Sequence, residues 1–110
     1  AANMVNVPLA AGAGSRQFRE AVSDAWVPAL EAFRPQLVLF SAGFDAHEED
    51  DMAMLRLSDA DYGWVTRQVK AVADRHAQGR IVSMLEGGYA LSALGRSVVQ
   101  HLRVLAGLNR

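Results

Sequence analysis

The sequence predicts an α/β fold in which a parallel sheet is covered by helices on both faces. Short apolar runs alternate along the chain with segments whose apolar residues recur every three or four positions, a pattern typical of strands alternating with helices. The clearest run, LVLF at 37–40, has no polar alternation, as expected of a strand with both faces covered. The length of 110 residues suits one modest domain. The expected order is β-α-β-α-β-α, with right-handed crossovers between the strands.

The first half of the chain is expected to supply one strand and one long helix. Residues 4–9 form a short extended apolar segment that we expect to be a strand. Because proline cannot donate to a sheet ladder, this strand should end at Pro8 or lie at an edge of the sheet. Residues 15–34 have apolar side chains at helical spacing, with Ser15 placed to cap the helix. Pro28 removes an internal hydrogen bond, so we expect two shorter helical pieces or a kink. The face is apolar on both sides of Pro28, which favours the kink.

The second half of the chain repeats this alternation. The central strand at 37–40 leads to a helix that begins at Ser58, where Asp61 three residues later completes a variant of the capping box. Gly79 supplies a left-handed end to this helix. A last strand at 81–85 is followed by an EGGY turn and by a third helical face that runs to Leu105.

The composition limits the class of protein. With 51% hydrophobic and 21% charged residues the chain is globular, and its net charge of -1 offers no basic field for nucleic acid. It has no cysteine, so a metal would have to be bound by Asp, Glu or His. We see no signal peptide and no run of about 18 apolar residues, so we expect a cytoplasmic protein without a membrane partner.

Three loops follow the predicted strands, and ligands of open parallel sheets bind beyond the carboxyl ends of the strands. The loops are AAGAGS at 10–15, SAGFDAHEEDDMAM at 41–54 and EGGYAL at 86–91. The first could cradle a phosphate on backbone N–H groups at a helix N-terminus. However, it lacks the third glycine of a dinucleotide motif and has no GK[ST], so a plain loop is favoured.

Asp45 is the first candidate ligand, because it follows a buried strand and Gly43 permits a sharp turn before it. An Asx turn or a cap is the competing interpretation, and turn chemistry alone favours it. His47 could join Asp45 on one metal, although a structural role is more common for such a histidine. The acids at 48–51 are most simply a solvated loop, because four carboxylates repel one another.

Tyr89 is the second candidate, at the end of the neighbouring predicted strand. Gly87 and Gly88 before it allow another backbone or a substrate to approach closely. The phenol could donate to a developing oxyanion near a metal at Asp45, or it could simply pack with its hydroxyl in water. His76 and His101 lie away from this edge, on or beside apolar helix faces, and are expected to be partly buried structural histidines.

Two longer stretches resemble a known family. PQLVLFSAGFDAH at 35–47 and GRIVSMLEGGYAL at 79–91, with VNVPL at 5–9 upstream, are similar to the C-terminal part of zinc-dependent histone deacetylases, especially the class II and bacterial acetylpolyamine amidohydrolase branches. The resemblance covers nearly the whole chain, and the ordered pair of motifs is specific. It implies a three-layer αβα, arginase/deacetylase-like fold, of which residues 1–110 would be the C-terminal portion of a single domain.

The resemblance also implies roles for five residues. Asp45 matches one of three protein ligands to a catalytic zinc ion, and Tyr89 matches the tyrosine that polarises the amide carbonyl and stabilises the oxyanion. Gly87 and Gly88 match glycines that form the narrow substrate channel, and Met52 falls where the family has an apolar residue of the pocket. The implied activity is hydrolysis of the acetyl-amide of acetyl-lysine or of an acetylated polyamine.

Two departures from the family pattern matter. The usual Pro-Leu-Gly-Gly is here Asp-Met-Ala-Met at 51–54, which puts the pocket wall and the substrate in question. The adjacent His pair and the Asp-x-His motif that carries the other two zinc ligands are absent, and His47 does not replace them because its family counterpart is not a ligand. We therefore expect a fragment that needs the remainder of the deacetylase domain and that alone is inactive and binds zinc poorly.

Two other functions remain open from the sequence. One is a non-catalytic α/β module that binds a phosphate or nucleotide at 12–15, and the other is a structural member of the family that only mediates association, including oligomers. The enzymatic interpretation requires that Asp45 and Tyr89 emerge from neighbouring strands toward a shared point.

Overall fold

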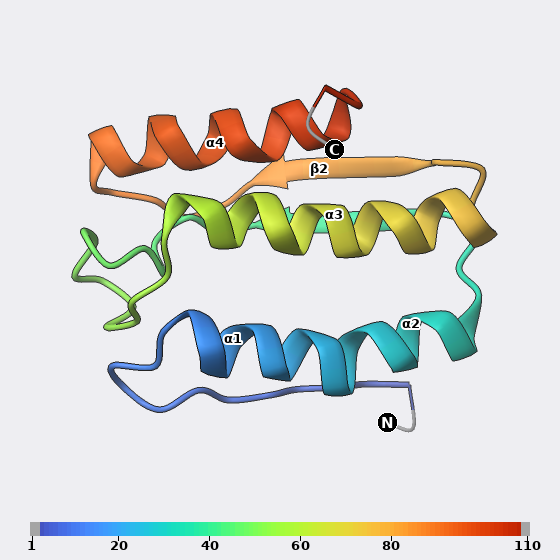
Figure 1. Cartoon of the computed structure of the whole chain (residues 1–110), viewed down its shortest axis with the longest axis horizontal. Coiled ribbons are helices and arrows are strands. Elements are labelled where there is room, and N and C mark those ends of the chain that lie inside the picture. The colour runs from blue at the N-terminus through green and yellow to red at the C-terminus, as the bar shows by residue number, and fades with distance from the viewer. Residues whose placement is uncertain (1–2, 109–110) are drawn as a thin grey trace.

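The computed structural model describes residues 3–108 and contains a parallel sheet with helices packed on one of its faces (Figure 1). Its elements in chain order are α1 (Ser15–Ala21), the π-helical segment η1 (Val22–Trp26), α2 (Val27–Phe33), β1 (Val38–Ala42), α3 (Asp59–His76), β2 (Ile81–Leu85) and α4 (Leu91–Leu105). The two strands pair in parallel, from Val38 opposite Ile81 to Ala42 opposite Leu85. None of the described helices has the length and apolar character needed to cross a membrane.

The predicted strand at 4–9 is wrong, because the structure assigns no strand to these residues. The segment instead runs beside the α1 to α2 helical stretch, where Asn3 and Val5 line a groove together with Trp26 and Phe33 (Figure 1). A strand forms only when a neighbouring strand completes its ladder. The sheet of residues 3–108 therefore has two strands rather than the expected three.

The long N-terminal helix accommodates Pro28 through a change of helical type. The Val27 N–H donates to the Val22 carbonyl five residues earlier, which is the bond of a π turn, and Pro28 then falls in the first turn of α2. The expected irregularity is thus a π segment just before Pro28, in a helical run that continues to Phe33 (Figure 1). The prediction that Ser15 caps α1 is wrong, because Gly14 is the N-cap residue.

The predicted capping box of α3 is confirmed and extends to α1. Ser58 is the N-cap residue, and its N–H donates to Asp61 Oδ2 at 2.9 Å. Asp61 is fully buried and also accepts bonds from Ser15 Oγ at 2.5 Å and Arg19 Nε at 2.8 Å. Burial raises the pKa of Asp61, but the bonds from Ser15, Ser58 and Arg19 outweigh it and lower the pKa below its ordinary value. The left-handed φ of +74° at Gly79, expected at the far end of α3, is present.

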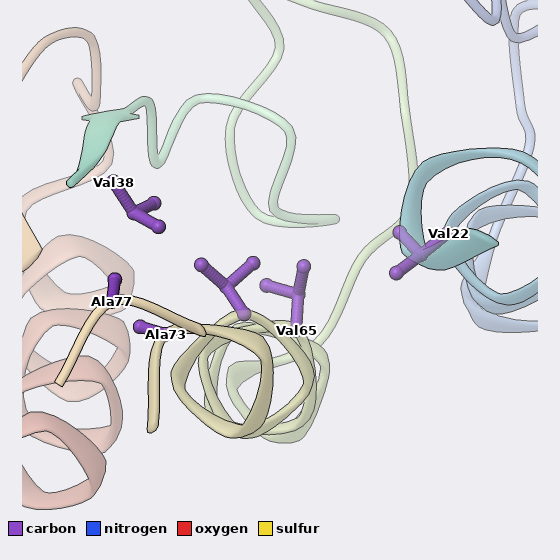
Figure 2. Packing of buried hydrophobic residues seen from close by; sticks show 6 residues of the cluster. Val22, Val38, Val65, Ala73 and Ala77 are labelled. Atoms are coloured by element: carbon purple, nitrogen blue, oxygen red, sulfur yellow. The ribbon is translucent and has the colours of Figure 1, made fainter. Parts of the chain in front are cut away.

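The apolar core joins β1, α3 and the π segment. Figure 2 shows Val65 and Ala73 of α3 facing Val38 of β1. Val22 of the π segment lies beyond Val65, on the side away from Val38. Burying a side chain of valine size contributes about 1.5 to 3 kcal/mol. A second buried cluster, formed by Ala42, Phe44, Leu57 and Tyr62, lies under the loops that follow the strands.

The predicted structural roles of His76 and His101 are confirmed. His76 Nε2 lies 2.7 Å from Glu31 Oε2, which links α3 to α2. His101 is 4% exposed and lies 2.8 Å from both Thr66 Oγ1 and Ser83 Oγ, so it joins α4 to α3 and β2. Burial lowers the pKa of His101 and so favours the neutral ring.

Candidate functional site

The loops that follow β1 and β2 meet the loop before α1 at one end of the molecule (Figure 1). The Gly12 N–H donates to the Met54 carbonyl, and the Phe44 N–H donates to the Gly87 carbonyl, each at 2.8 Å. Backbone hydrogen bonds therefore hold the three loops together. Only the second and third of them follow strands, and the prediction that these two share the carboxyl end of the sheet is confirmed.

Asp45 lies against the backbone of Gly87. A methyl group in place of the Gly87 hydrogen would lie 2.9 Å from both Cγ and Oδ2 of Asp45, closer than side chains normally approach. The Asp45 side chain is half-buried at this contact. Glycine at position 87 is therefore what allows the carboxylate to reach this place between the two strand ends.

Gly88 is required by its backbone conformation and by its close neighbours. Its φ of +144° is a conformation that residues with a side chain rarely adopt, and a Cβ there would lie 2.8 Å from Leu94 Cδ1 and 3.1 Å from Phe44 Cβ. The chain can therefore turn tightly over Phe44 before it enters α4. This turn sets the direction in which Tyr89 leaves the sheet.

Tyr89 lies at the same edge as Asp45 and is 60% exposed. The two residues follow strands that are paired in parallel, and the Asp45 carboxylate packs on Gly87, two residues before Tyr89. The structure thus places both residues on adjoining loops of one rim, and the convergence of their side chains on a shared point stays a prediction. A phenol at such a rim is accessible to a ligand.

Asp50 is a site residue that the sequence interpretation missed. It is only 4% exposed, and its Oδ2 accepts hydrogen bonds from the N–H groups of Tyr89 at 2.7 Å and Ala90 at 3.1 Å. Its Oδ1 accepts from the Met52 N–H at 3.0 Å. The backbone bonds from Met52 and Tyr89 lower the pKa of Asp50 below its ordinary value. The prediction that this acid is solvated is therefore wrong.

His47 has a structural role. It is 2% exposed, its Nε2 lies 2.6 Å from Asp59 Oδ1, and its Nδ1 accepts from the Glu49 N–H at 3.0 Å. Because Nδ1 is an acceptor, the ring proton is on Nε2 and is donated to Asp59. Both ring nitrogens are occupied, so the prediction that His47 is not a metal ligand agrees with its contacts.

Arg96 of α4 fixes the acidic loop from the outside. Its Nε donates to Asp59 Oδ2 at 3.0 Å, and its Nη2 pairs with Glu49. Burial raises the pKa of Asp59, but hydrogen bonds from His47 and Arg96 outweigh it, so the pKa is lowered. Glu49 is thus paired with Arg96 although it is exposed, as Glu48 and Asp51 are, and Asp50 is the one buried member of the acidic run.

Met52 lies on the same loop and is 64% exposed. Met54, two residues later, is 67% exposed and has a φ of +56°, and its carbonyl accepts the Gly12 bond. The loop therefore presents methionine side chains at the rim that carries Tyr89. Their exposure leaves them accessible to a substrate, and the role of Met52 in a pocket wall stays a prediction.

Most of the donors that a phosphate site would need at residues 12–15 are already used. The Gly12 N–H bonds to Met54, the Gly14 N–H donates to Gln17 Oε1 at 3.0 Å, and the Ala13 N–H donates to the Ala10 carbonyl. The Ser15 hydroxyl donates to the buried Asp61 carboxylate. These contacts argue against the phosphate-binding module.

The described chain offers only part of a metal site. Among residues 3–108, no group of three or more His, Cys, Asp or Glu side chains is arranged to hold a metal ion. Asp45 fits one ligand position, since it is a half-buried carboxylate at a loop-bearing strand end. Further ligands would have to come from outside these residues.

A cavity of about 150 Å³ lies beneath the loops rather than at the rim. It is mainly apolar, with walls that include Phe40, Phe44, Tyr62 and His101. Neither Asp45 nor Tyr89 lines it. The candidate site is therefore the rim formed by these two residues, not this cavity.

Comparisons with known proteins point to one family. Residues 1–105 match the family model described as "Histone deacetylase domain". The chain is 41% identical over 106 residues to "Type-2 histone deacetylase 2" of Dictyostelium discoideum, which covers 94% of this chain and 6% of that protein. It is 39% identical over 101 residues to "Histone deacetylase-like amidohydrolase" of Pseudomonas aeruginosa, which covers 89% of this chain and 27% of that protein.

Solved structures agree with these relatives. The histone deacetylase Clr3 superposes with a TM-score of 0.85 at 31% identity, over 94% of this chain and 17% of that one. The HDA15 HD domain gives a TM-score of 0.82 at 29% identity, over 91% of this chain and 27% of that one. The chain thus spans less than a third of the length of each of these proteins.

Proposed function

This chain belongs to the histone deacetylase family, and from that premise we propose that the protein carrying it is a zinc-dependent amide hydrolase that acts on acetyl-lysine or on an acetylated polyamine. The observation that carries the proposal is the contact of the Asp45 carboxylate with Gly87, two residues before Tyr89, at the rim where β1 and β2 end.

Asp45 is proposed to supply one anionic ligand to the metal. A zinc ion, when bound, would polarise the substrate carbonyl and lower the pKa of its water. The task of Asp45 is to hold its carboxylate at a fixed place with a fixed charge. The close contact with Gly87 restricts the positions that this carboxylate can take.

Tyr89 is proposed to stabilise the oxyanion that develops when the amide is attacked. The phenol O–H is a hydrogen-bond donor, and its exposure at the rim leaves it accessible to a carbonyl oxygen. A donor that strengthens its bond as charge develops lowers the barrier more than it improves binding.

Gly87, Gly88 and Met52 are proposed to line the substrate channel. The two glycines would contribute backbone atoms to the channel, since the space at their missing side chains is taken by Asp45, Leu94 and Phe44. The exposed Met52 side chain could pack on an aliphatic stem. Both acetyl-lysine and an acetylated polyamine have such a stem. The unusual sequence at 51–54 would then influence the choice between them.

The two remaining zinc ligands are proposed to come from other parts of the domain. We propose that the isolated 110-residue chain is inactive, because a catalytic zinc site uses three protein ligands and Asp45 is one. The partner that completes the site is the rest of the same domain.

The test is a pair of substitutions in the full-length protein. Tyr89→Phe should lower kcat by about 100- to 1,000-fold, the usual effect of removing one oxyanion donor, with zinc content unchanged. Asp45→Ala should lose both zinc and activity. Turnover is measured on an acetyl-lysine peptide and on an acetylated polyamine, and zinc by elemental analysis.

Two results would contradict the proposal. Near-full activity of the Tyr89→Phe variant would remove the oxyanion role. Stoichiometric zinc in the Asp45→Ala variant would show that this carboxylate is not a ligand.

A further inference from the structure

We infer that Asp50 is a positioning residue that holds Tyr89 and the Met52 loop in one fixed arrangement. The inference rests on the proposed role of Tyr89. Asp50 would not touch the substrate itself, since its side chain is only 4% exposed and its oxygens face backbone N–H groups.

The contacts of Asp50 join two loops that are far apart in sequence. One oxygen accepts from Tyr89 and Ala90 at the start of α4, and the other accepts from Met52 on its own loop. The N-terminus of a helix of 15 residues favours a negative charge at this place. A buried carboxylate with three backbone donors is therefore a well-satisfied connection between the loops.

The exposure of Tyr89 makes this connection important for its orientation. Within the described chain, a ring that is 60% exposed is covered only in part by other side chains. Its position depends on the backbone that carries it, which is held by the tight turn at Gly88 and by the Asp50 bond to the Tyr89 N–H. Catalytic donors need placement within a fraction of an ångström, so loss of this bond should reduce turnover.

The same carboxylate couples Tyr89 to the proposed channel wall. Because Met52 donates to Oδ1 while Tyr89 donates to Oδ2, a shift of Asp50 moves both. We therefore expect a change at Asp50 to alter kcat and also the preference between the acetyl-lysine and acetylated polyamine substrates.

The experiment is a double-mutant cycle in the full-length protein. Asp50→Asn replaces one acceptor oxygen with an NH₂ group, which cannot accept, so at least one of the three backbone bonds is lost. We expect kcat to fall about 10- to 100-fold with zinc content unchanged. The matched control is Glu48→Gln, which removes an exposed carboxylate of the same loop and should leave kcat within about twofold.

The second arm combines Asp50→Asn with Tyr89→Phe. If Asp50 acts through Tyr89, the double variant is no slower than Tyr89→Phe alone, within about twofold. A purely structural defect would instead multiply the two losses. Thermal unfolding shows whether the Asp50→Asn variant folds. If it does not, Asp50→Glu takes its place in the same cycle, because it keeps the charge but displaces it by one methylene.

The outcomes separate this inference from the proposed function. Two outcomes overturn the inference alone, provided that Tyr89→Phe shows a large loss of kcat. In the first, the losses of kcat multiply in the double variant. In the second, the Asp50 variants fold and retain wild-type kcat. Full activity of Tyr89→Phe overturns the oxyanion role and the inference together. Non-multiplied losses at unchanged zinc content support both.

Discussion

Gly87 determines how close Asp45 comes to the loop that carries Tyr89. The Asp45 carboxylate occupies the space that a side chain at position 87 would need, because a Cβ there would lie only 2.9 Å from the carboxylate. This contact explains glycine at position 87 by the needs of the proposed metal ligand, in addition to the channel role that the family resemblance implies.

Substituting Gly87 by alanine should therefore displace Asp45. In the full-length protein we expect Gly87→Ala to weaken zinc binding at least about tenfold and to lower activity in parallel, because a ligand displaced by a few tenths of an ångström no longer completes the coordination geometry. Zinc affinity is measured by competition with a chelator.

Gly95 provides the control for this substitution. A methyl group there would meet nothing within 4 Å, and alanine is the better helix former within α4. Gly95→Ala should leave zinc affinity unchanged and stability equal or higher. Equal zinc affinity in both variants would show that position 87 does not constrain Asp45.

The sequence was sufficient to predict the positions of Asp45 and Tyr89 but not of Asp50. The first two follow buried runs directly, and the ends of parallel strands share an edge. Asp50 bonds to a residue 39 positions away, and an acidic run of four residues gives no local sign of which member is buried. A contact of this kind depends on the fold, so local patterns could not reveal it.

At the scale of elements, His101 links α4 to both α3 and β2. The Thr66 hydroxyl donates to the Tyr62 carbonyl, so it accepts from His101 Nδ1, and the Ser83 hydroxyl donates to Nε2. The rings of Phe40 and Phe44 pack against it at centroid distances of 5.0 and 5.8 Å. These contacts favour the neutral ring, which agrees with the lowered pKa of His101.

The neutral His101 predicts that the protein loses stability in mild acid. Its folded pKa lies below the ordinary value of 6.5, so the unfolded chain binds more protons once the pH falls below about 6.5, and the free energy of unfolding decreases by up to about 1.4 kcal/mol per pH unit from this group. Urea unfolding of the protein at pH 7.5, 6.5 and 5.5 measures this decrease.

His101→Gln serves as the control, because glutamine does not titrate. The slope between pH 6.5 and 5.5 should be smaller in this variant by the His101 contribution, and identical slopes would contradict the prediction. Asp61 and Glu31 affect stability at lower pH. Their pKa values in the folded protein are lowered, to about 2 for Glu31. The stability that these two carboxylates contribute is therefore lost only as the pH falls through their folded pKa values.

Helices were predicted more reliably than strands for a physical reason. Helical bonds and caps are local, so the periodicity and the Ser58–Asp61 pair were enough to place α3. A strand depends on a neighbour, and the apolar segment 4–9 has no strand beside it within the described chain. The proline in the first helix signalled an irregularity, but whether it became a kink or a π turn depended on packing.

At the scale of the whole molecule, one face of the sheet is covered and the other is open. Side chains of Val38 and Ala42 point to the buried face, whereas Leu39 and its register partner Val82 lie on the opposite face and are 73% and 48% exposed. Met84 on the same face is 61% exposed. The continuous LVLF run fits a sheet with two covered faces, and the described chain provides cover for only one.

This open face predicts opposite effects of one substitution in two contexts. In the isolated chain, Leu39→Gln should change the free energy of unfolding by no more than about 0.5 kcal/mol and should reduce self-association, because it removes an exposed apolar group. In the full-length protein, where we propose that the rest of the domain covers this face, the same change should lower the free energy of unfolding by at least about 2 kcal/mol, since it buries a polar group and leaves a poorly filled site.

Arg16→Gln, at an exposed position of α1, is the control and should have little effect on the free energy of unfolding in either context. Sedimentation velocity of the isolated chain and urea unfolding of both proteins make the comparison, and a small effect in the full-length protein would show that another surface contacts the rest of the domain.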